Sequence, residues 1–204
     1  MKALPEVPVQ PVVLRSDEHG VTTLTLNRPK QFKAINDALL TELQTSLDAI
    51  AADSSVRVVV IAGAGPAFCP GHDLKEMLAN STLAFISDLF QRCSAVMLSI
   101  RRIPQPVIAK VHGIATAAGC QIVAACDLAV AAEDSRFATS GINFGLFCAT
   151  PGVPVSRNIS QKRAFEMLMT GAFIDAPTAL ACGLLNRVAP AGELDAAVAA
   201  RRCN

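Results

Sequence analysis

The chain has no tryptophan and no tyrosine, and only three histidines among its 204 residues. Aromatic side chains provide the stacking surfaces on which single-stranded nucleic acids bind, so their scarcity argues against that class of partner. The formal net charge is +1, which leaves no strong attraction for a phosphate backbone or an anionic membrane surface. The composition therefore predicts that nucleic acid is not a partner.

Metal-binding and disulfide patterns are also missing. The seven cysteines stand at positions 69, 93, 120, 126, 148, 182 and 203, and none belongs to a Cys-x-x-Cys pair. Zinc-ligand spacing is therefore absent, and we expect no metal site. An odd number of cysteines in a chain of this length argues against a disulfide scaffold. We expect reduced, mostly buried thiols in a protein that is cytoplasmic, or mitochondrial if its source is eukaryotic.

No uninterrupted apolar stretch is long enough to span a bilayer, because Asp127 interrupts the best candidate, residues 122–132. The N-terminus lacks the apolar core of a signal peptide. Hydrophobic residues make up 51% of the chain and charged residues 17%, which is typical of one globular domain. We expect a flexible arm over residues 1–10, a core over 11–192 and the start of a truncated C-terminal helical region over 193–204.

Strand and helix patterns alternate along the chain. Apolar, β-branched runs predict buried strands over residues 56–62, 107–111 and 128–132. Leucines at helical spacing predict a helix after Asn36, which has the residue type of an N-cap. Further elements are expected as a hairpin (12–15 and 21–27, turning at 17–20), a short strand (137–138) and helices (82–101, 117–125, from 155 or 158 to 169, and 176–182). The alternation predicts an α/β fold.

Two glycine-rich segments each follow a strand-like run and open toward a helix-like run. They are residues 67–77 (AFCPGHDLKEM) and 111–123 (VHGIATAAGCQIV). The first N–H groups of a helix have no partner within the helix and favour negative charge. If the two helix starts converge, their N–H groups could hold one anionic oxygen and stabilise an enolate or a tetrahedral oxyanion.

These segments, together with residues 26–30 (LNRPK), 106–109 (PVIA), 126–129 (CDLA) and 144–146 (FGL), resemble the enoyl-CoA hydratase/isomerase, or crotonase, superfamily over nearly the whole chain. The resemblance implies an α/β fold of the ClpP-like crotonase type, a spiral of ββα units. It also implies an acyl-CoA thioester as partner, with coenzyme A as part of the substrate and no separate cofactor. Family members form homotrimers, often paired into hexamers.

The resemblance assigns roles to individual residues. The backbone N–H groups of His72 and Ala118 would form the oxyanion hole. Lys33 and Lys75 would lie near the phosphates of coenzyme A, because lysine is a common phosphate ligand. The residues expected to contact coenzyme A are Lys33, His72, Asp73, Leu74, Lys75 and Gly119.

The chain departs from the family pattern where hydration needs its acids. Hydratases carry two glutamates that flank the attacking water, and the matching positions here are Gln121 and Gly141. Neither residue can act as a general base. Losing such a group costs roughly 10²–10⁴-fold in rate, so ordinary hydratase activity is not expected.

Three readings of the site remain open. One is an enzyme that works through an enolate, as isomerase, weak hydratase or decarboxylase. Family decarboxylases share the Gly-His-Asp sequence around His72, and the tyrosine they place later would fall near Cys148. Cys148 could also serve as nucleophile or acid, and Gln121 could orient a water or be an ordinary residue of its helix. Another reading is a non-catalytic CoA-thioester binder, and the last is a regulatory protein.

Overall fold

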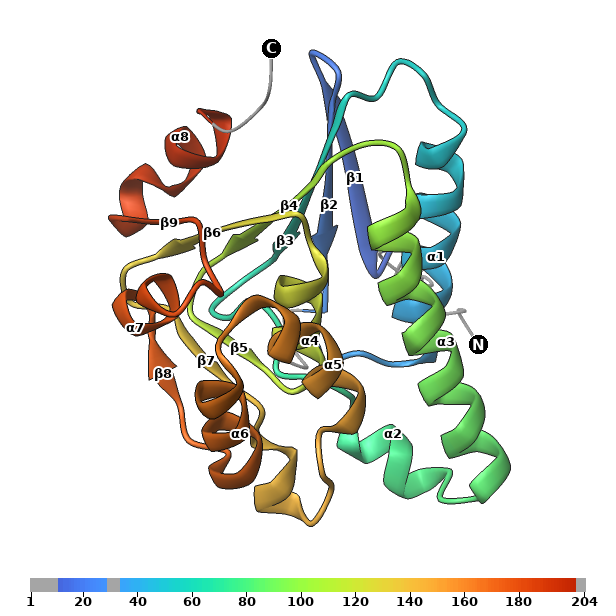
Figure 1. The fold of residues 1–204 in the computed structure, drawn as a ribbon. Helices are drawn as coiled ribbons and strands as arrows, with labels where there is room; N and C mark the ends of the chain where they lie inside the picture. The colour runs from blue at the N-terminus through green and yellow to red at the C-terminus, as the bar shows by residue number, and fades with distance from the viewer. Residues whose placement is uncertain (1–10, 29–33, 201–204) are drawn as a thin grey trace, which may run out of the picture.

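The computed structural model describes residues 11–28 and 34–200, and every structural statement below concerns these residues. The arm expected over residues 1–10 lies outside them, as do residues 29–33 and 201–204. Within the described residues, strands and helices alternate along the chain, which confirms the α/β class (Figure 1).

A six-stranded sheet runs through the centre of the molecule. Its strands, in spatial order, are β1 (Val13–Glu18), β2 (Val21–Leu26), β3 (Val58–Gly63), β4 (Val107–Val111), β6 (Leu128–Ala132) and β9 (Arg187–Ala189). β1 pairs with β2 in antiparallel orientation, and every later pair is parallel. Strands covered on both faces need no polar alternation, which explains the continuous apolar runs of β3 and β4.

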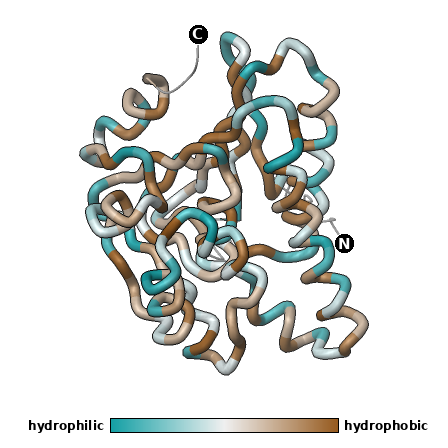
Figure 2. The backbone as a smooth tube through the Cα atoms, viewed as in Figure 1, coloured by the Kyte–Doolittle hydropathy of each residue, from teal (hydrophilic) through white to brown (hydrophobic). Residues whose placement is uncertain are grey.

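Both faces of this sheet are covered by helices. Val59 and Ile61 of β3 face the larger core cluster, with α1 (Asp37–Ala51), α3 (Leu83–Arg102) and α4 (Ala118–Ala125). Their neighbours Val58 and Val60 point the other way, into a second cluster with α8 (Leu194–Ala199). Figure 1 shows α1 and α3 on the opposite side of the sheet from α8. In Figure 2 the central strands are predominantly hydrophobic, whereas the outer turns carry most of the hydrophilic segments.

A smaller sheet holds β5 (Ile114–Thr116), β7 (Arg136–Ala138) and β8 (Ile174–Asp175). β4, β5 and α4 form one strand–strand–helix unit, and β6, β7 and α5 (Ala149–Asn158) form the next. Because β4 pairs with β6 and β5 pairs with β7, successive units stack on one another. This is the spiral of ββα units that the resemblance implied.

The remaining elements surround this spiral. They are α2 (Leu74–Ala79), the 3₁₀ turns η2 (Ser140–Phe144) and η3 (Ala191–Glu193), α6 (Gln161–Thr170) and α7 (Ala176–Ala181). α8 lies inside the C-terminal helical region expected over residues 193–204. α2 is the helix-like run expected at the end of the first glycine-rich segment, whereas the short strands β5, β8 and β9 were not expected.

Local signals explain most element boundaries. Asn36 caps α1 as predicted, since its side-chain oxygen accepts a hydrogen bond from the N–H of Leu39 (3.0 Å). The hairpin is confirmed, but its turn is tighter than predicted. Only His19 and Gly20 lie outside the strands, and both have positive φ (51° and 79°), as two-residue hairpin turns require.

A helix was predicted from residue 155 or 158 to residue 169, and of these the start at 155 is wrong, whereas the start at 158 is within three residues of α6. The chain instead leaves the helical conformation at Ile159 and restarts after Ser160, giving α5 and α6. The Asn158 side-chain amide donates to the carbonyls of Pro154 (2.8 Å) and Ala124 (2.9 Å), so it ties the end of α5 to α4. That contact comes from tertiary packing, which helical spacing does not report.

Among the described helices, α3 is the one whose length and hydropathy would allow it to cross a bilayer. Its buried side chains belong to the core, where the helix packs against α1 and α4. They are Leu89, Cys93, Val96, Met97 and Ile100. A core helix of a globular domain has this pattern, and α3 gives no strong indication of a membrane span.

Candidate active site

The two glycine-rich segments lie side by side. The N–H of Cys69 donates to the carbonyl of Ile114 (3.0 Å), and the N–H of Thr116 donates to the carbonyl of Cys69 (3.0 Å). Only glycine fits at position 119, because a Cβ there would lie 2.0 Å from the Cys69 carbonyl oxygen. The packing of β5 and α4 onto the 67–73 segment therefore depends on Gly119.

The backbone N–H groups of His72 and Ala118 are among those at this junction for which the described residues provide no hydrogen-bond acceptor. Ala118 is the first residue of α4, and Ala117 before it adopts φ 50° and ψ −121°, an uncommon conformation for a residue other than glycine. Gly71, with φ 100°, brings its Cα close enough that an added Cβ would lie 3.4 Å from the Ala118 nitrogen. The two segments thus bring residues 72 and 118 to one region.

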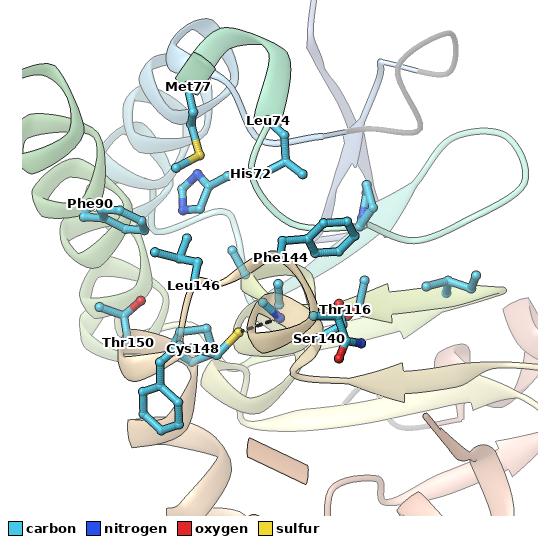
Figure 3. Close-up of a pocket in the computed structure, with 18 of the residues that line it drawn as sticks. His72, Leu74, Met77, Phe90, Thr116, Ser140, Phe144, Leu146, Cys148 and Thr150 are labelled. Atoms are coloured by element: carbon cyan, nitrogen blue, oxygen red, sulfur yellow. Dashed lines mark hydrogen bonds between the residues drawn. The ribbon is translucent and has the colours of Figure 1, made fainter. Parts of the chain in front are cut away.

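That region is a cavity of about 520 Å³, shown in Figure 3. Its described lining consists of Pro70, His72, Leu74, Met77, Phe90, Ile114, Thr116, Ala117, Ala118, Ser140, Gly141, Asn143, Phe144, Leu146, Phe147, Cys148, Thr150, Pro151 and Phe173. No aspartate or glutamate is among these residues, and most of the wall is apolar. Phe144, Leu146 and Phe147 are more than two-fifths exposed, so they form an apolar rim. Such a site suits a ligand with a hydrocarbon part.

The side chain of His72 lies at the cavity wall (Figure 3). The imidazole packs edge-on against Phe90, with ring centroids 5.1 Å apart and an angle of 79° between the planes. Both ring nitrogens are buried and have no hydrogen-bond partner. Burial lowers the pKa of His72 to about 4, and the nearby Ile35 carbonyl offsets this only in part. The ring is therefore neutral at physiological pH.

Gly141 and Cys148 face each other across the loop between η2 and α5. The Gly141 N–H donates to Cys148 Sγ (3.3 Å). A Cβ at position 141 would lie 2.8 Å from that sulfur and 2.3 Å from the Leu146 carbonyl oxygen. Burial raises the pKa of the Cys148 thiol, and the Gly141 N–H acts against this. The space beside residue 141 is thus filled by the loop that carries Cys148.

Gln121 does not line the cavity with the other predicted residues. It lies on α4, is 4% exposed, and its side-chain oxygen is buried without a hydrogen-bond partner. The structure therefore shows neither a direct place for Gln121 in the cavity wall nor a hydrogen bond from a neighbour to that oxygen.

Only some of the residues expected to contact coenzyme A line the cavity. Leu74 lines the cavity, Lys75 is exposed on α2, and Gly119 serves the packing contact with Cys69. Asp73 caps α2 by accepting from the N–H of Lys75 (3.1 Å) and Glu76, and its carboxylate pairs with Arg28 (3.0 Å). Lys33 lies outside the described residues.

A model of the enoyl-CoA hydratase/isomerase family matches residues 16–202. The chain belongs to this family. It is 47% identical over 175 residues to the human protein "enoyl-CoA hydratase domain-containing protein 3, mitochondrial", covering 86% of this chain and 58% of that protein. A relative of the same name from Xenopus laevis is 44% identical over 184 residues, covering 90% of this chain and 63% of the relative. The chain therefore spans about three-fifths of the length of these curated relatives.

Solved structures agree with the family assignment. A crystal structure of an enoyl-CoA hydratase from Mycobacterium smegmatis superposes with a TM-score of 0.92 at 57% identity, covering 94% of this chain and 75% of that one. The crystal structure of human enoyl-CoA hydratase domain-containing protein 3 gives 0.90 at 43% identity, covering 93% and 75%. The crotonase fold expected from the motifs is thereby confirmed.

For this member of the hydratase/isomerase family, sequence reasoning missed most of the apolar wall. Four of the nine phenylalanines line the cavity: Phe90, Phe144, Phe147 and Phe173. Phe144 ends η2 and Phe147 follows it three residues later, and this local pair of aromatic residues was the signal that the sequence offered. Sequence reasoning also missed Thr116 and Ser140, whose hydroxyl groups are hydrogen-bonded to each other (2.7 Å).

Among the described residues, no group of three or more His, Cys, Asp or Glu side chains could hold a metal ion.

Proposed function

We propose that the cavity binds an acyl-CoA thioester, and that the thioester carbonyl oxygen accepts hydrogen bonds from the N–H groups of His72 and Ala118. One observation carries this proposal. Both N–H groups belong to residues that line one cavity, and neither has a partner in the rest of the described chain. Backbone donors away from water are usually paired, and the N–H at a helix start favours an anionic or carbonyl oxygen, so these two donors favour an acceptor supplied by a ligand.

The chemistry of the walls supports the same ligand class. Two N–H donors aimed at a carbonyl oxygen stabilise the negative charge that develops when a thioester becomes an enolate. The apolar walls and the exposed aromatic rim fit an acyl chain. Lys75, exposed on the neighbouring helix, is available to the phosphates of coenzyme A, and we propose the same role for Lys33.

Acid–base chemistry is the part that the cavity supports least. None of its described lining residues is a carboxylate, and the one imidazole is neutral. We therefore propose a protein that binds and polarises the thioester but hydrates an enoyl-CoA more slowly than a hydratase with both glutamates. The expected loss of rate is roughly 10²–10⁴-fold for each missing acid or base. A non-catalytic binder or regulatory protein is the limiting case.

Decarboxylation is a second candidate for the same site. Loss of CO₂ from a 2-carboxyacyl-CoA leaves an enolate directly, so the reaction needs the two N–H donors but no general base. A cavity that has open donors and no described carboxylate suits this requirement. A carboxylate substrate would also avoid repulsion from acidic side chains.

Binding is tested by titrating hexanoyl-CoA into the protein by calorimetry, and by infrared spectroscopy of the ligand labelled with ¹³C at its thioester carbonyl. We expect saturable binding and a carbonyl stretch displaced to lower frequency. The Ala118→Pro variant removes one N–H at the first helical position and should weaken binding at least tenfold, provided that far-UV circular dichroism shows a native fold despite the positive φ of Ala117. A bound thioester whose carbonyl stretch matches the free ligand would contradict the proposal, whatever the variant does.

Turnover is tested by incubating the protein with a saturated, an α,β-unsaturated and a 2-carboxyacyl-CoA and following products by mass spectrometry. Carbon dioxide release that is lost in Ala118→Pro would favour the decarboxylase. Binding of all three without products would favour the non-catalytic binder. Hydration at rates usual for enzymes would show that an acid–base group acts there after all.

Assembly and location are proposed from the family alone. We propose a homotrimer, or a hexamer of two trimers, which would bury some of the exposed apolar side chains such as Leu78, Leu83 and Phe165. Light scattering after size-exclusion chromatography distinguishes these from a monomer. The human and Xenopus relatives carry "mitochondrial" in their names, and we propose that location if the source is eukaryotic.

A further inference from the structure

The cavity holds a reactive group that thioester binding does not use, the thiol of Cys148. Among the described lining residues, Cys148 and His72 are the only ones with titratable side chains. Cys148 is 7% exposed, and its sulfur is held at the wall by the N–H of Gly141 (3.3 Å). Figure 3 shows this sulfur between Leu146 and the Thr116–Ser140 pair. The thiol is therefore fixed in the chamber that the ligand would enter.

A second feature of the same chamber points to a ligand. Both ring nitrogens of His72 are buried without partners, although a neutral imidazole can donate one hydrogen bond and accept another. Unpaired buried polar atoms are costly, and a ligand group that met one of them after the ring turned would remove part of that cost. His72 and Ala118, whose N–H groups have no acceptor among the described residues, line the same cavity as the thiol.

We propose that Cys148 adds to the β-carbon of an α,β-unsaturated acyl-CoA bound in this cavity and forms a covalent thioether. The inference rests on the proposed function, because the thioester carbonyl must occupy the two N–H donors. The sulfur forms a bond to the β-carbon while the α,β π-bond breaks, and that electron pair becomes the enolate held by those donors. The thiol proton leaves to solvent, and the α-carbon takes one proton from solvent. Nothing is oxidised or reduced, and no group leaves.

The composition of the cavity explains why sulfur would add where water would not. Water needs a general base to attack a β-carbon, and the described lining holds no carboxylate. A cysteine sulfur is a far better nucleophile than water even when only a small fraction is ionised. Attack on the thioester carbonyl instead would exchange one thioester for another of similar energy, which free coenzyme A reverses. The thioether is the product that persists.

The test incubates the whole protein with trans-2-hexenoyl-CoA and, in parallel, with hexanoyl-CoA, and records the intact mass. We expect a single increase equal to the full mass of the hexenoyl-CoA, located at Cys148 by peptide mapping. Hexanoyl-CoA should give none. The Cys148→Ala variant should lose the adduct, whereas Cys182→Ala should keep it, because Cys182 is half-buried and outside the cavity lining.

Hexanoyl-CoA binding separates failure of this inference from failure of the proposed function. If Cys148→Ala still binds hexanoyl-CoA, loss of its adduct reports chemistry rather than misfolding, and Cys148→Ser supplies the same check with the Gly141 contact retained. If the wild type binds hexanoyl-CoA but gains no mass from hexenoyl-CoA, the addition is refuted and the binding proposal stands. A gain of the hexenoyl mass alone, or an adduct on another cysteine, also refutes the addition. If neither ligand binds, both proposals fail.

Discussion

The Cα of Gly119 faces the carbonyl oxygen of Cys69 so closely that an added Cβ would lie 2.0 Å from that oxygen. The same carbonyl accepts a hydrogen bond from the N–H of Thr116 (3.0 Å). The two glycine-rich segments are therefore locked together at the start of α4, and the N–H of Ala118 is positioned by this contact.

Gly119→Ala is expected to lower the free energy of unfolding by about 1–3 kcal/mol, because the methyl group must push apart two packed backbones. It should also weaken acyl-CoA binding, since Ala118 moves with it. The matched control is Gly192→Ala, where an added Cβ meets nothing within 4 Å and the change should stay within about 0.5 kcal/mol. Urea unfolding followed by far-UV circular dichroism measures both, which suits a chain without tryptophan or tyrosine. Equal stabilities for the two variants would contradict the packing argument.

The buried imidazole of His72 makes stability depend on pH. Its pKa is about 4 in the folded protein and about 6.5 when unfolded, so the unfolded chain binds more protons between these values. This contribution to stability is complete above the unfolded pKa and is lost as the pH falls toward 4. Between pH 7 and pH 5 it should amount to about 1–2 kcal/mol.

The measurement compares His72→Asn with His19→Asn, since His19 is exposed in the β1–β2 turn. Only His72→Asn should lose less stability than the wild type on going from pH 7 to pH 5. Parallel pH dependence in all three proteins would mean that the ring is not kept neutral by burial.

Gly141 has little room for any side chain. We expect Gly141→Ala to destabilise the fold by about 1–3 kcal/mol, because its methyl group would lie 2.3 Å from the Leu146 carbonyl oxygen. A glutamate introduced here should therefore displace the 146–148 loop rather than simply restore a catalytic acid. Wild-type thermal stability in Gly141→Ala would show that this loop yields easily.

Gln121→Glu is expected to be destabilising at neutral pH and not to create hydration. The side chain is 4% exposed and its oxygen has no donor, so a carboxylate there would be buried without compensation, at a cost of about 1–3 kcal/mol. Burial raises the pKa of such a group, so the loss should shrink as the pH is lowered. Unfolding at pH 7 and pH 5, compared with Gln121→Met, tests this. A stable variant that hydrates enoyl-CoA would show that a base at this position reaches the substrate.

Asp73 links the first glycine-rich segment to Arg28. Asp73→Ala should cost about 1–3 kcal/mol, because it removes the cap of α2 and leaves the largely buried Arg28 without its ion pair (3.0 Å). Asp73→Asn keeps a capping oxygen and should cost less. Thermal unfolding ranks the two, and an order reversed from this one would assign the role to charge alone.

Much of the architecture was readable without coordinates. The sequence predicts the uniformly apolar strands β3 and β4, because a strand that is buried on both faces has no polar alternation. Asn36 and Thr82 mark helix starts through the hydrogen bonds that their side chains make locally. The break between α5 and α6 was not readable, since it depends on the Asn158 side chain reaching α4.

The sequence likewise predicted some residues of the site and not others. Its motifs led to His72, Ala118, Gly141 and Cys148, which line one cavity, but they also led to Gln121 and Gly119, which do not. The apolar wall includes four phenylalanines from three separate segments, and nothing in the sequence predicts that Phe90, the Phe144–Phe147 pair and Phe173 meet.

The sequence by itself determined the α/β class, the family and the two glycine-rich turns, because those features depend on neighbouring residues and on short-range backbone geometry. Only the tertiary structure decided which side chains share the cavity, how far burial lowers the pKa of His72, and that a sulfur fills the space beside Gly141. Those properties arise from packing between segments distant in the chain, where desolvation and steric fit depend on three-dimensional neighbours.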